Sequence, residues 1–207
     1  MLEELIKRYQ ILKKCETDII RAYSSIAKCF EKNHHLYICG NGGSSSDALH
    51  MVGELAKSFL LERTLDEKFR LRCNNIELCA NLQGALPAIA LVENVALSTA
   101  YANDCNADYI FAQQVYTYAR NGDCVLGIST SGNSKNVVYA CETAKARGAT
   151  AIALTGNHGG ILKEICDICI CVPEYETYKI QELHLPIYHT ICMLLEEHFW
   201  GENGIWK

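Results

Sequence analysis

The sequence predicts an α/β fold in which a five-stranded parallel sheet is flanked by helices on both faces. Short apolar runs alternate with longer amphipathic segments, which is the pattern of strands joined by helical crossovers. Two apolar runs end directly in clusters of glycine and serine, as parallel strands do where they border a ligand site. The expected strands are 36–39, 87–92, 123–129, 150–155 and 167–172, and the helices expected after the first strand are 45–61, 94–103, 108–119, 134–147, 159–166 and 180–199.

A long helix is expected ahead of the first strand, over residues 2–32. Its apolar side chains recur at helical spacing, and so long an apolar face exceeds what a small sheet domain can readily cover. We therefore expect residues 1–33 to form an oligomerisation helix that packs against other copies of the chain with closed symmetry. The apolar positions are Leu5, Tyr9, Leu12, Ile19, Ile20, Tyr23, Ile26 and Phe30.

Length and composition indicate one domain. The 207 residues are 49% hydrophobic and 21% charged, which is enough for a single α/β domain, 1–207, with its own core. The net charge of −5 leaves no broad basic face for a nucleic acid or an anionic membrane. No run approaches the roughly 20 apolar residues of a membrane span, and the N-terminus lacks an apolar signal core. We expect a cytoplasmic protein with neither kind of partner.

The twelve cysteines are scattered through apolar runs and are expected to be reduced core residues. The closest group is Cys166-x-x-Cys169-x-Cys171, which could begin a thiolate metal or cluster site. A second pair at matching spacing is missing, and apolar residues alternate with the last two cysteines. The pattern favours a buried strand.

Both glycine and serine clusters are expected where a strand end meets a helix start. A helix N-terminus offers unpaired N–H groups and the positive end of its dipole, so it can bind an anion. The second cluster adds four hydroxyls, which can bind a phosphate without Lys or Arg; an ordinary N-cap would need only one. A third cluster, 155–160, lacks serine and is expected to be a turn and helix start. The two clusters are Gly40-Asn41-Gly42-Gly43-Ser44 and Ser129-Thr130-Ser131-Gly132-Asn133-Ser134.

His50 and Glu54, four residues apart, lie on one face of the helix expected over 45–61. This spacing suits a shared metal or substrate, although spacing alone favours an ordinary surface pair. In the last helix, Glu182 and His189 are seven apart and nearly share a face, whereas Gln181 lies about 80° away from His189. Spacing alone would therefore pair His189 with Glu182.

Taken together, these motifs resemble the SIS-domain (sugar isomerase) phosphoheptose isomerase family over nearly the whole chain. The resemblance implies a single SIS domain with a flavodoxin-like three-layer architecture. It also implies a ketose–aldose isomerase that converts sedoheptulose 7-phosphate to D-glycero-D-manno-heptose 7-phosphate, in a homotetramer. Besides the two clusters, the matching segments are Asp47-Ala48-Leu49-His50, Leu86-Pro87-Ala88-Ile89-Ala90-Leu91, Asn103-Asp104 and Ile180-Gln181-Glu182-Leu183-His184.

The resemblance also assigns roles to residues. Glu54 would be the carbon base and His189 the acid. A divalent metal, expected to be zinc, would be held by His50, Glu54, Gln181 and His189; this selects Gln181 over Glu182, and Pro186 could kink the helix to allow it. The implied substrate contacts are Asn41, Gly42, Gly43, Ser44, Glu54, Asn103, Asp104, Ser129, Thr130, Ser131, Ser134 and Gln181.

The chain departs from the family pattern in three places. Ser58, beside Lys57, replaces a common arginine, and Tyr178 replaces a common aspartate. Residues 64–85, without a clear period, are expected to be an insertion. SIS modules also serve as non-catalytic sugar-phosphate sensors or as assembly proteins that associate with a replication initiator. Retention of all four metal-site residues argues against these roles, and an isomerase or lyase for amino-sugar phosphates is a third alternative.

Overall fold

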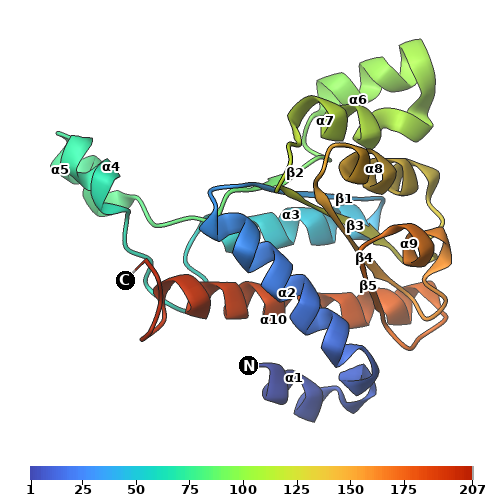
Figure 1. Ribbon diagram of the computed structural model, residues 1–207, viewed down its shortest axis with the longest axis horizontal. Helices are drawn as coiled ribbons and strands as arrows, with labels where there is room; N and C mark the ends of the chain where they lie inside the picture. Colours follow the sequence, from blue (N-terminus) through green and yellow to red (C-terminus); the bar gives the residue numbers. More distant parts are fainter. Residues whose placement is uncertain (207) are drawn as a thin grey trace.

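A computed structural model describes residues 1–206 of the chain, with the five expected strands in one parallel sheet (Figure 1). The strand order β2-β1-β3-β4-β5 is that of a flavodoxin-like fold, so the predicted fold class is confirmed. β2 is shorter than expected, and the other strands fall within one residue of their predicted bounds. The strands are β1 (Leu36–Gly40), β2 (Ala88–Ala90), β3 (Cys124–Ser129), β4 (Thr150–Thr155) and β5 (Ile168–Cys171).

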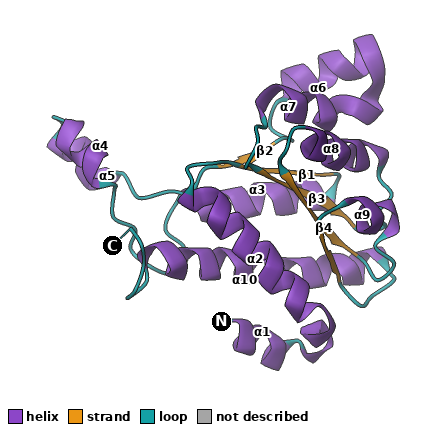
Figure 2. Ribbon diagram, in the orientation of Figure 1, coloured by secondary structure: helices purple, strands orange, loops and turns teal. Residues whose placement is uncertain are grey.

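Helices cover both faces of the sheet and make three layers (Figure 2). Successive residues of a strand point to opposite faces, so Leu36 and Ile38 of β1 enter one core while Tyr37 and Cys39 enter the other. The first core is closed by α2 (Glu16–Glu31), α3 (Gly43–Ala56) and α10 (Thr177–Trp200). The second lies under α7 (Ile110–Tyr118), α8 (Lys135–Ala146) and α9 (Gly160–Ile165).

The N-terminal segment is not the single helix expected over 2–32. It consists of α1 (Leu2–Arg8), a 3-10 helix η1 (Gln10–Cys15) and α2, with a break at Tyr9. Leu5, Leu12, Ile19, Ile26 and Phe30 are buried in the chain's own first core. The turn at Tyr9 folds the segment back, so the domain itself covers most of the face that we expected to need a second copy.

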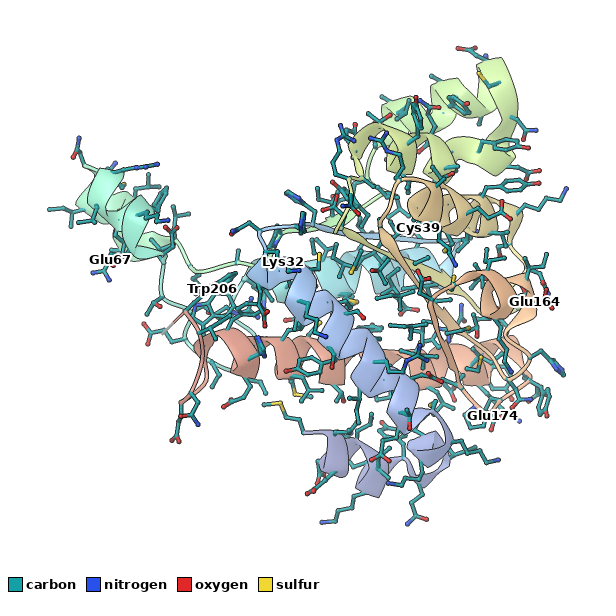
Figure 3. All side chains as sticks on the ribbon, in the orientation of Figure 1. Lys32, Cys39, Glu67, Glu164, Glu174 and Trp206 are labelled. Carbon is teal, nitrogen blue, oxygen red and sulfur yellow. The ribbon has the colours of Figure 1, made fainter. Side chains whose placement is uncertain are left out.

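Residues 64–85 leave the body of the protein as a projecting arm. Its stem is closed where Gly84 N donates to Arg63 O at 3.0 Å, and Trp200 Nε1 donates to Thr64 O at 3.2 Å. Beyond the stem lie two short helices, α4 (Glu67–Arg72) and α5 (Ile76–Asn81), neither of which has a buried residue. In Figures 1 and 3, these helices and the labelled Glu67 stand apart from the rest of the molecule.

The segment after β2 is helical but irregular. α6 (Val95–Tyr101) continues into a π-helical turn η2 (Ala102–Asn106) and a 3-10 turn η3 (Ala107–Tyr109) before α7 begins. The turns η2 and η3 separate α6 from α7 near the boundary predicted between the helices expected over 94–103 and 108–119.

The thiols Cys169 and Cys171 lie on β5, which confirms the strand interpretation. Their Sγ atoms are 3.5 Å apart, and all twelve cysteines are free. Within residues 1–206, no helix combines the length and apolar character needed to span a membrane.

The sheet order also locates the ligand-binding edge. From β1 the chain first adds β2 on one side and then crosses to place β3 on the other, so the order reverses between β1 and β3. Gly40 pairs with Ile128, which brings the carboxyl ends of these two strands side by side. Ligands bind at such reversal points in open parallel sheets, and both glycine and serine clusters begin here.

Candidate active site

The glycine cluster after β1 makes a tight turn into α3. Gly42 has φ +53° and ψ −120°, which a residue with a side chain adopts poorly, and α3 begins at the next residue without a side-chain cap. A Cβ on Gly43 would lie 2.6 Å from Gln181 Nε2, so α10 approaches the start of α3 very closely. The uncapped first turn of α3 can therefore offer its N–H groups to an anion.

The serine cluster after β3 lies next to this turn. Ser129 Oγ and Ser134 Oγ are 3.0 Å apart, and Ser131 Oγ accepts a hydrogen bond from Asn133 N at 3.1 Å. Gly132 has φ +68°, and a Cβ there would come within 1.9 Å of Gly159 O. The third cluster therefore supports the shape of this loop, as well as forming the expected turn before α9.

Asn136, which the sequence analysis did not single out, joins the two clusters. Asn41 Nδ2 donates to Asn136 Oδ1, and Asn136 Nδ2 donates to Asn41 Oδ1, both at 2.9 Å. This reciprocal pair links the glycine turn to the first turn of α8. An asparagine two residues past a serine N-cap carries no sequence signal for such a contact.

His50, Glu54 and His189 come together where α3 packs against α10. His50 Nε2 is 3.4 Å from Glu54 Oε1 and 3.4 Å from His189 Nε2. Burial lowers the pKa of His189 below its ordinary value, and neighbouring His50 adds to this effect. His189 is therefore biased toward the neutral form, which can exchange a proton or bind a metal.

Gln181 lies against Gly43, two turns before His189 on α10, while Glu182 is exposed. The packing thus brings Gln181, rather than Glu182, against the first turn of α3. α10 continues through Pro186 without ending. His184, for which no role was assigned, is fully buried, and burial lowers its pKa to about 4.

The remaining predicted residues, Asn103 and Asp104, lie on the exposed π-helical turn η2. Asn103 Nδ2 donates to Asp104 Oδ1 at 2.8 Å. The fold places this turn in the layer of α6 and α7, on the opposite side of the sheet from α3 and α10 (Figure 1). The two residues are thus separate from the histidine group in this chain.

The donor atoms suit a divalent metal. Ligands about 2.0–2.1 Å from a tetrahedral zinc are about 3.3–3.4 Å from one another, close to the two separations around His50 Nε2. Among residues 1–206, no group of three or more His, Cys, Asp or Glu side chains is placed so that it could hold a metal ion as it stands. The separations of His50 from Glu54 and from His189 fit zinc, and Gln181 would have to complete the set.

Comparisons with known proteins point to one family. The SIS domain model matches residues 3–83 and 78–156. A phosphoheptose isomerase of Crocosphaera subtropica is 41% identical over 87% of this chain and 82% of its own length. One from Nitratiruptor sp. is 38% identical over 95% of this chain and 97% of its own length. The chain belongs to the SIS-domain phosphoheptose isomerase family.

A solved structure extends the family likeness to three dimensions. The phosphoheptose isomerase of Francisella tularensis superimposes with a TM-score of 0.78 at 31% identity, over 94% of each chain. The sheet and its flanking helices are thus those of the phosphoheptose isomerase family.

Ser58 lies where the family resemblance led us to expect an arginine. Its Oγ is buried without a hydrogen-bond partner among residues 1–206, and its N donates to Gln83 Oε1 at 3.0 Å. Lys57 puts a positive charge beside Glu54, since its Nζ donates to Glu54 Oε2 at 3.1 Å. Tyr178, which lies where we expected an aspartate, is exposed and donates to Glu176 Oε2 at 3.4 Å.

A buried ion pair fixes the end of α3, and the sequence analysis missed it. Arg63 Nε donates to Glu196 Oε1 at 2.7 Å, and the guanidinium also donates to Leu55 O and Glu54 O at 2.8 and 2.9 Å. Glu196 in turn accepts from the backbone N–H groups of residues 59–61. Burial opposes ionisation of Glu196, but these backbone bonds and Arg63 outweigh it and lower its pKa.

Proposed function

We propose that this chain interconverts sedoheptulose 7-phosphate and D-glycero-D-manno-heptose 7-phosphate. The observation that carries the proposal is the group His50, Glu54 and His189, brought to separations of 3.4 Å on the helices that border the glycine and serine turns. A base, an acid and an anion-binding turn are the groups that this isomerisation requires. The names of the relatives support the same reaction.

In the proposed mechanism, Glu54 moves a proton between two carbons. Its carboxylate takes a proton from C1 of the ketose, the electron pair forms the C1–C2 double bond of the enediol, and the carbonyl electrons move to O2. His189 protonates O2 and then takes the proton from O1 as the C1 carbonyl forms, which restores the acid. The proton on Glu54 returns to C2, which gives the aldose and restores the carboxylate.

We propose zinc as the metal, held by His50, Glu54, Gln181 and His189. When bound, the cation supplies a Lewis acid that polarises the sugar carbonyl. Glu54 can serve as ligand and base because its two oxygens face different groups. Oε1 faces His50 Nε2, whereas Oε2 accepts from Lys57 Nζ.

We propose that the two turns provide most of the substrate contacts. The phosphate would be bound by the hydroxyls of Ser44, Ser129, Thr130, Ser131 and Ser134 and by the first turn of α3. The sugar hydroxyls would meet Asn41, Gly42, Gly43 and Gln181, and Asn103 and Asp104 remain proposed contacts by family resemblance.

Ser131→Asp is expected to weaken binding of the ketose phosphate at least about tenfold. At a separation of about 4 Å, like charges repel by several kcal/mol even at an effective dielectric constant of 20, and tenfold requires only about 1.4 kcal/mol. Isothermal titration calorimetry measures the change. Ser131→Asn, similar in size but uncharged, is the matched control. Equal affinities of Ser131→Asp and Ser131→Asn would place the phosphate elsewhere.

A substrate panel tests the proposed function. Purified protein is incubated with C5, C6 and C7 ketose phosphates, and aldose formation is followed by NMR. We expect turnover to be fastest with sedoheptulose 7-phosphate. Binding of a sugar phosphate without turnover would favour the sensor alternative, and turnover confined to an amino-sugar phosphate would favour the third.

We also propose that the chain forms a homo-oligomer, with the family's tetramer as the expected size. The arm formed by residues 64–85 supports the oligomer. Its helices α4 and α5 have six residues each and are too short to be stable without packing against other structure. Leu71 and Ile76 are 77% and 86% exposed, so a second copy would bury them. A cytoplasmic location is proposed too, since twelve free cysteines suit a reducing compartment.

Light scattering should show that Leu71→Glu/Ile76→Glu reduces the oligomer size. Ile20→Glu, at a 43% exposed position on α2, is the matched control for the surface originally expected to associate. If Ile20→Glu dissociated the oligomer and Leu71→Glu/Ile76→Glu did not, the interface would lie on the N-terminal segment. A monomeric unmodified chain would refute the oligomer.

A further inference from the structure

A chain of hydrogen bonds lies behind the histidine group. His50 Nδ1 is 3.0 Å from Tyr188 Oη, and Tyr188 Oη donates to Asp47 Oδ1 at 3.3 Å. Tyr188 is only 1% exposed, and Asp47 Oδ2 is buried with no hydrogen-bond partner among residues 1–206. The three side chains thus form a relay that runs from inside the fold to the ring of a proposed metal ligand.

Residues of α3 and α10 fix the orientation of the His50 ring from both sides. Asp47 and His50 are three residues apart on α3 and therefore share a face. Tyr188 and His189 are consecutive on α10, and their rings meet His50 edge-on with centroid separations of 5.6 and 4.9 Å. His50 is held between the two, with Nδ1 toward Tyr188 and Nε2 toward His189.

Counting protons along the relay, with Tyr188 as the donor to Asp47, assigns a tautomer to His50. A tyrosine hydroxyl carries one proton, and Tyr188 gives it to Asp47. The hydroxyl oxygen must then accept from His50, so Nδ1 carries the ring proton. In a neutral imidazole this leaves Nε2 with a free lone pair, and that atom faces Glu54 Oε1 at 3.4 Å.

We propose that Tyr188 and Asp47 are positioning residues, which hold His50 in the Nδ1–H tautomer and present its Nε2 lone pair toward Glu54 and His189. Two lone-pair atoms facing each other repel unless a proton or cation lies between them. Since the relay keeps the ring proton of His50 on the far side of the ring, the Nε2 lone pair is free to bind a cation or to accept a proton from His189 Nε2. This inference deepens the proposed function and rests on it.

The simpler interpretation is that Tyr188 is a core residue whose hydroxyl merely needs a partner. In that case His50 could carry its proton on Nε2 and donate to Glu54, and Tyr188 would donate to His50 Nδ1. The two interpretations place the proton on different nitrogens of His50, so one measurement separates them.

The test uses metal-free, substrate-free full-length chain labelled with ¹⁵N-histidine. Long-range ¹H–¹⁵N NMR correlation distinguishes the protonated from the unprotonated ring nitrogen, and His50→Gln assigns the His50 signals. We expect the Nδ1–H form in the unmodified chain and a shift toward Nε2–H in Tyr188→Phe, which keeps the ring and removes only the hydroxyl. Zinc affinity, measured by competition with a chromophoric chelator, should fall about 10- to 100-fold.

Tyr23→Phe is the matched control, because Tyr23 Oη lies 3.1 Å from His198 Nδ1 in a similar pair between α2 and α10. It should leave the His50 tautomer and zinc affinity unchanged. Asp47→Asn keeps an acceptor oxygen for Tyr188, so its effect should be smaller than that of Tyr188→Phe.

Two outcomes overturn the proposal: an Nε2–H His50 in the unmodified chain, or a tautomer unaltered by Tyr188→Phe. Both leave the proposed function intact if the chain still converts ketose to aldose. Conversely, the expected tautomer change in a chain without isomerase activity would uphold the relay and refute the proposed reaction.

Discussion

Glu54→Gln and His189→Ala should each lower isomerase turnover by about 10²-fold or more while the fold stays intact. Gln cannot accept the C1 proton, and Ala cannot exchange one with the sugar oxygens, so each change removes a proton-transfer group. The loss should appear in kcat, measured by NMR on sedoheptulose 7-phosphate, with circular dichroism unchanged.

Glu182→Gln is the control for these catalytic variants. Helical spacing alone favours Glu182 as the partner of His189, yet it is exposed on α10. It should retain nearly full turnover. If Glu182→Gln lost activity as severely as Glu54→Gln, or if both catalytic variants kept near-normal turnover, the assigned roles would be wrong.

Arg63→Met should destabilise the fold by about 3–5 kcal/mol, the largest stability effect we expect. Arg63 and Glu196 are 0% and 1% exposed, and removing the guanidinium leaves the Glu196 carboxylate buried without its counter-charge. It also removes the donors to the carbonyls of Leu55 and Glu54 at the end of α3. Denaturant unfolding of the full chain measures the change.

Two comparisons sharpen this stability prediction. Lys13→Met breaks the exposed pair Lys13 and Glu16 and should cost less than about 1 kcal/mol. Adding Glu196→Gln to Arg63→Met removes the uncompensated charge, so the double variant should be less destabilised than the sum of the two single changes. Additive losses, or an Arg63→Met effect as small as that of Lys13→Met, would contradict the role given to the ion pair.

The sheet and the two glycine and serine turns could be predicted because they depend on local patterns. Apolar runs such as 124–129 are followed by glycine and serine, and the strands of the structure end at the same positions. The reversal of strand order between β1 and β3 then brings Gly40 and Ser129 to the same edge. Helical spacing likewise put His50 and Glu54 on one face, as the structure has them.

The N-terminal segment shows where local patterns fail. Its apolar spacing is helical nearly throughout, and no glycine or proline marks the break at Tyr9. Whether such an apolar face is covered depends on how the segment folds back onto α10 and the sheet. The spacing of apolar residues along the segment does not predict that arrangement. The expectation of an uncovered face was wrong for that reason.

The site contacts that could not be predicted from the sequence join segments that are far apart in the chain. Tyr188 approaches His50, and Glu196 approaches Arg63, only because α3 and α10 run alongside each other. The same packing explains Gln181: it meets Gly43 in the first turn of α3 while His189 meets His50 two turns later. Gln181 and His189 therefore contact different turns of α3 and need not lie on the same face of α10.

Deuterium incorporation tests the central claim most directly. Sedoheptulose 7-phosphate is incubated with the protein in D₂O, and the sugar phosphates are followed by ¹H NMR. Proton transfer by Glu54 predicts an aldose phosphate that carries deuterium at C2, to the extent that the proton on the carboxylate exchanges with solvent, and a loss of both product and label in Glu54→Gln. No aldose and no exchange at C1 of the ketose, at any concentration of folded protein, would contradict the account.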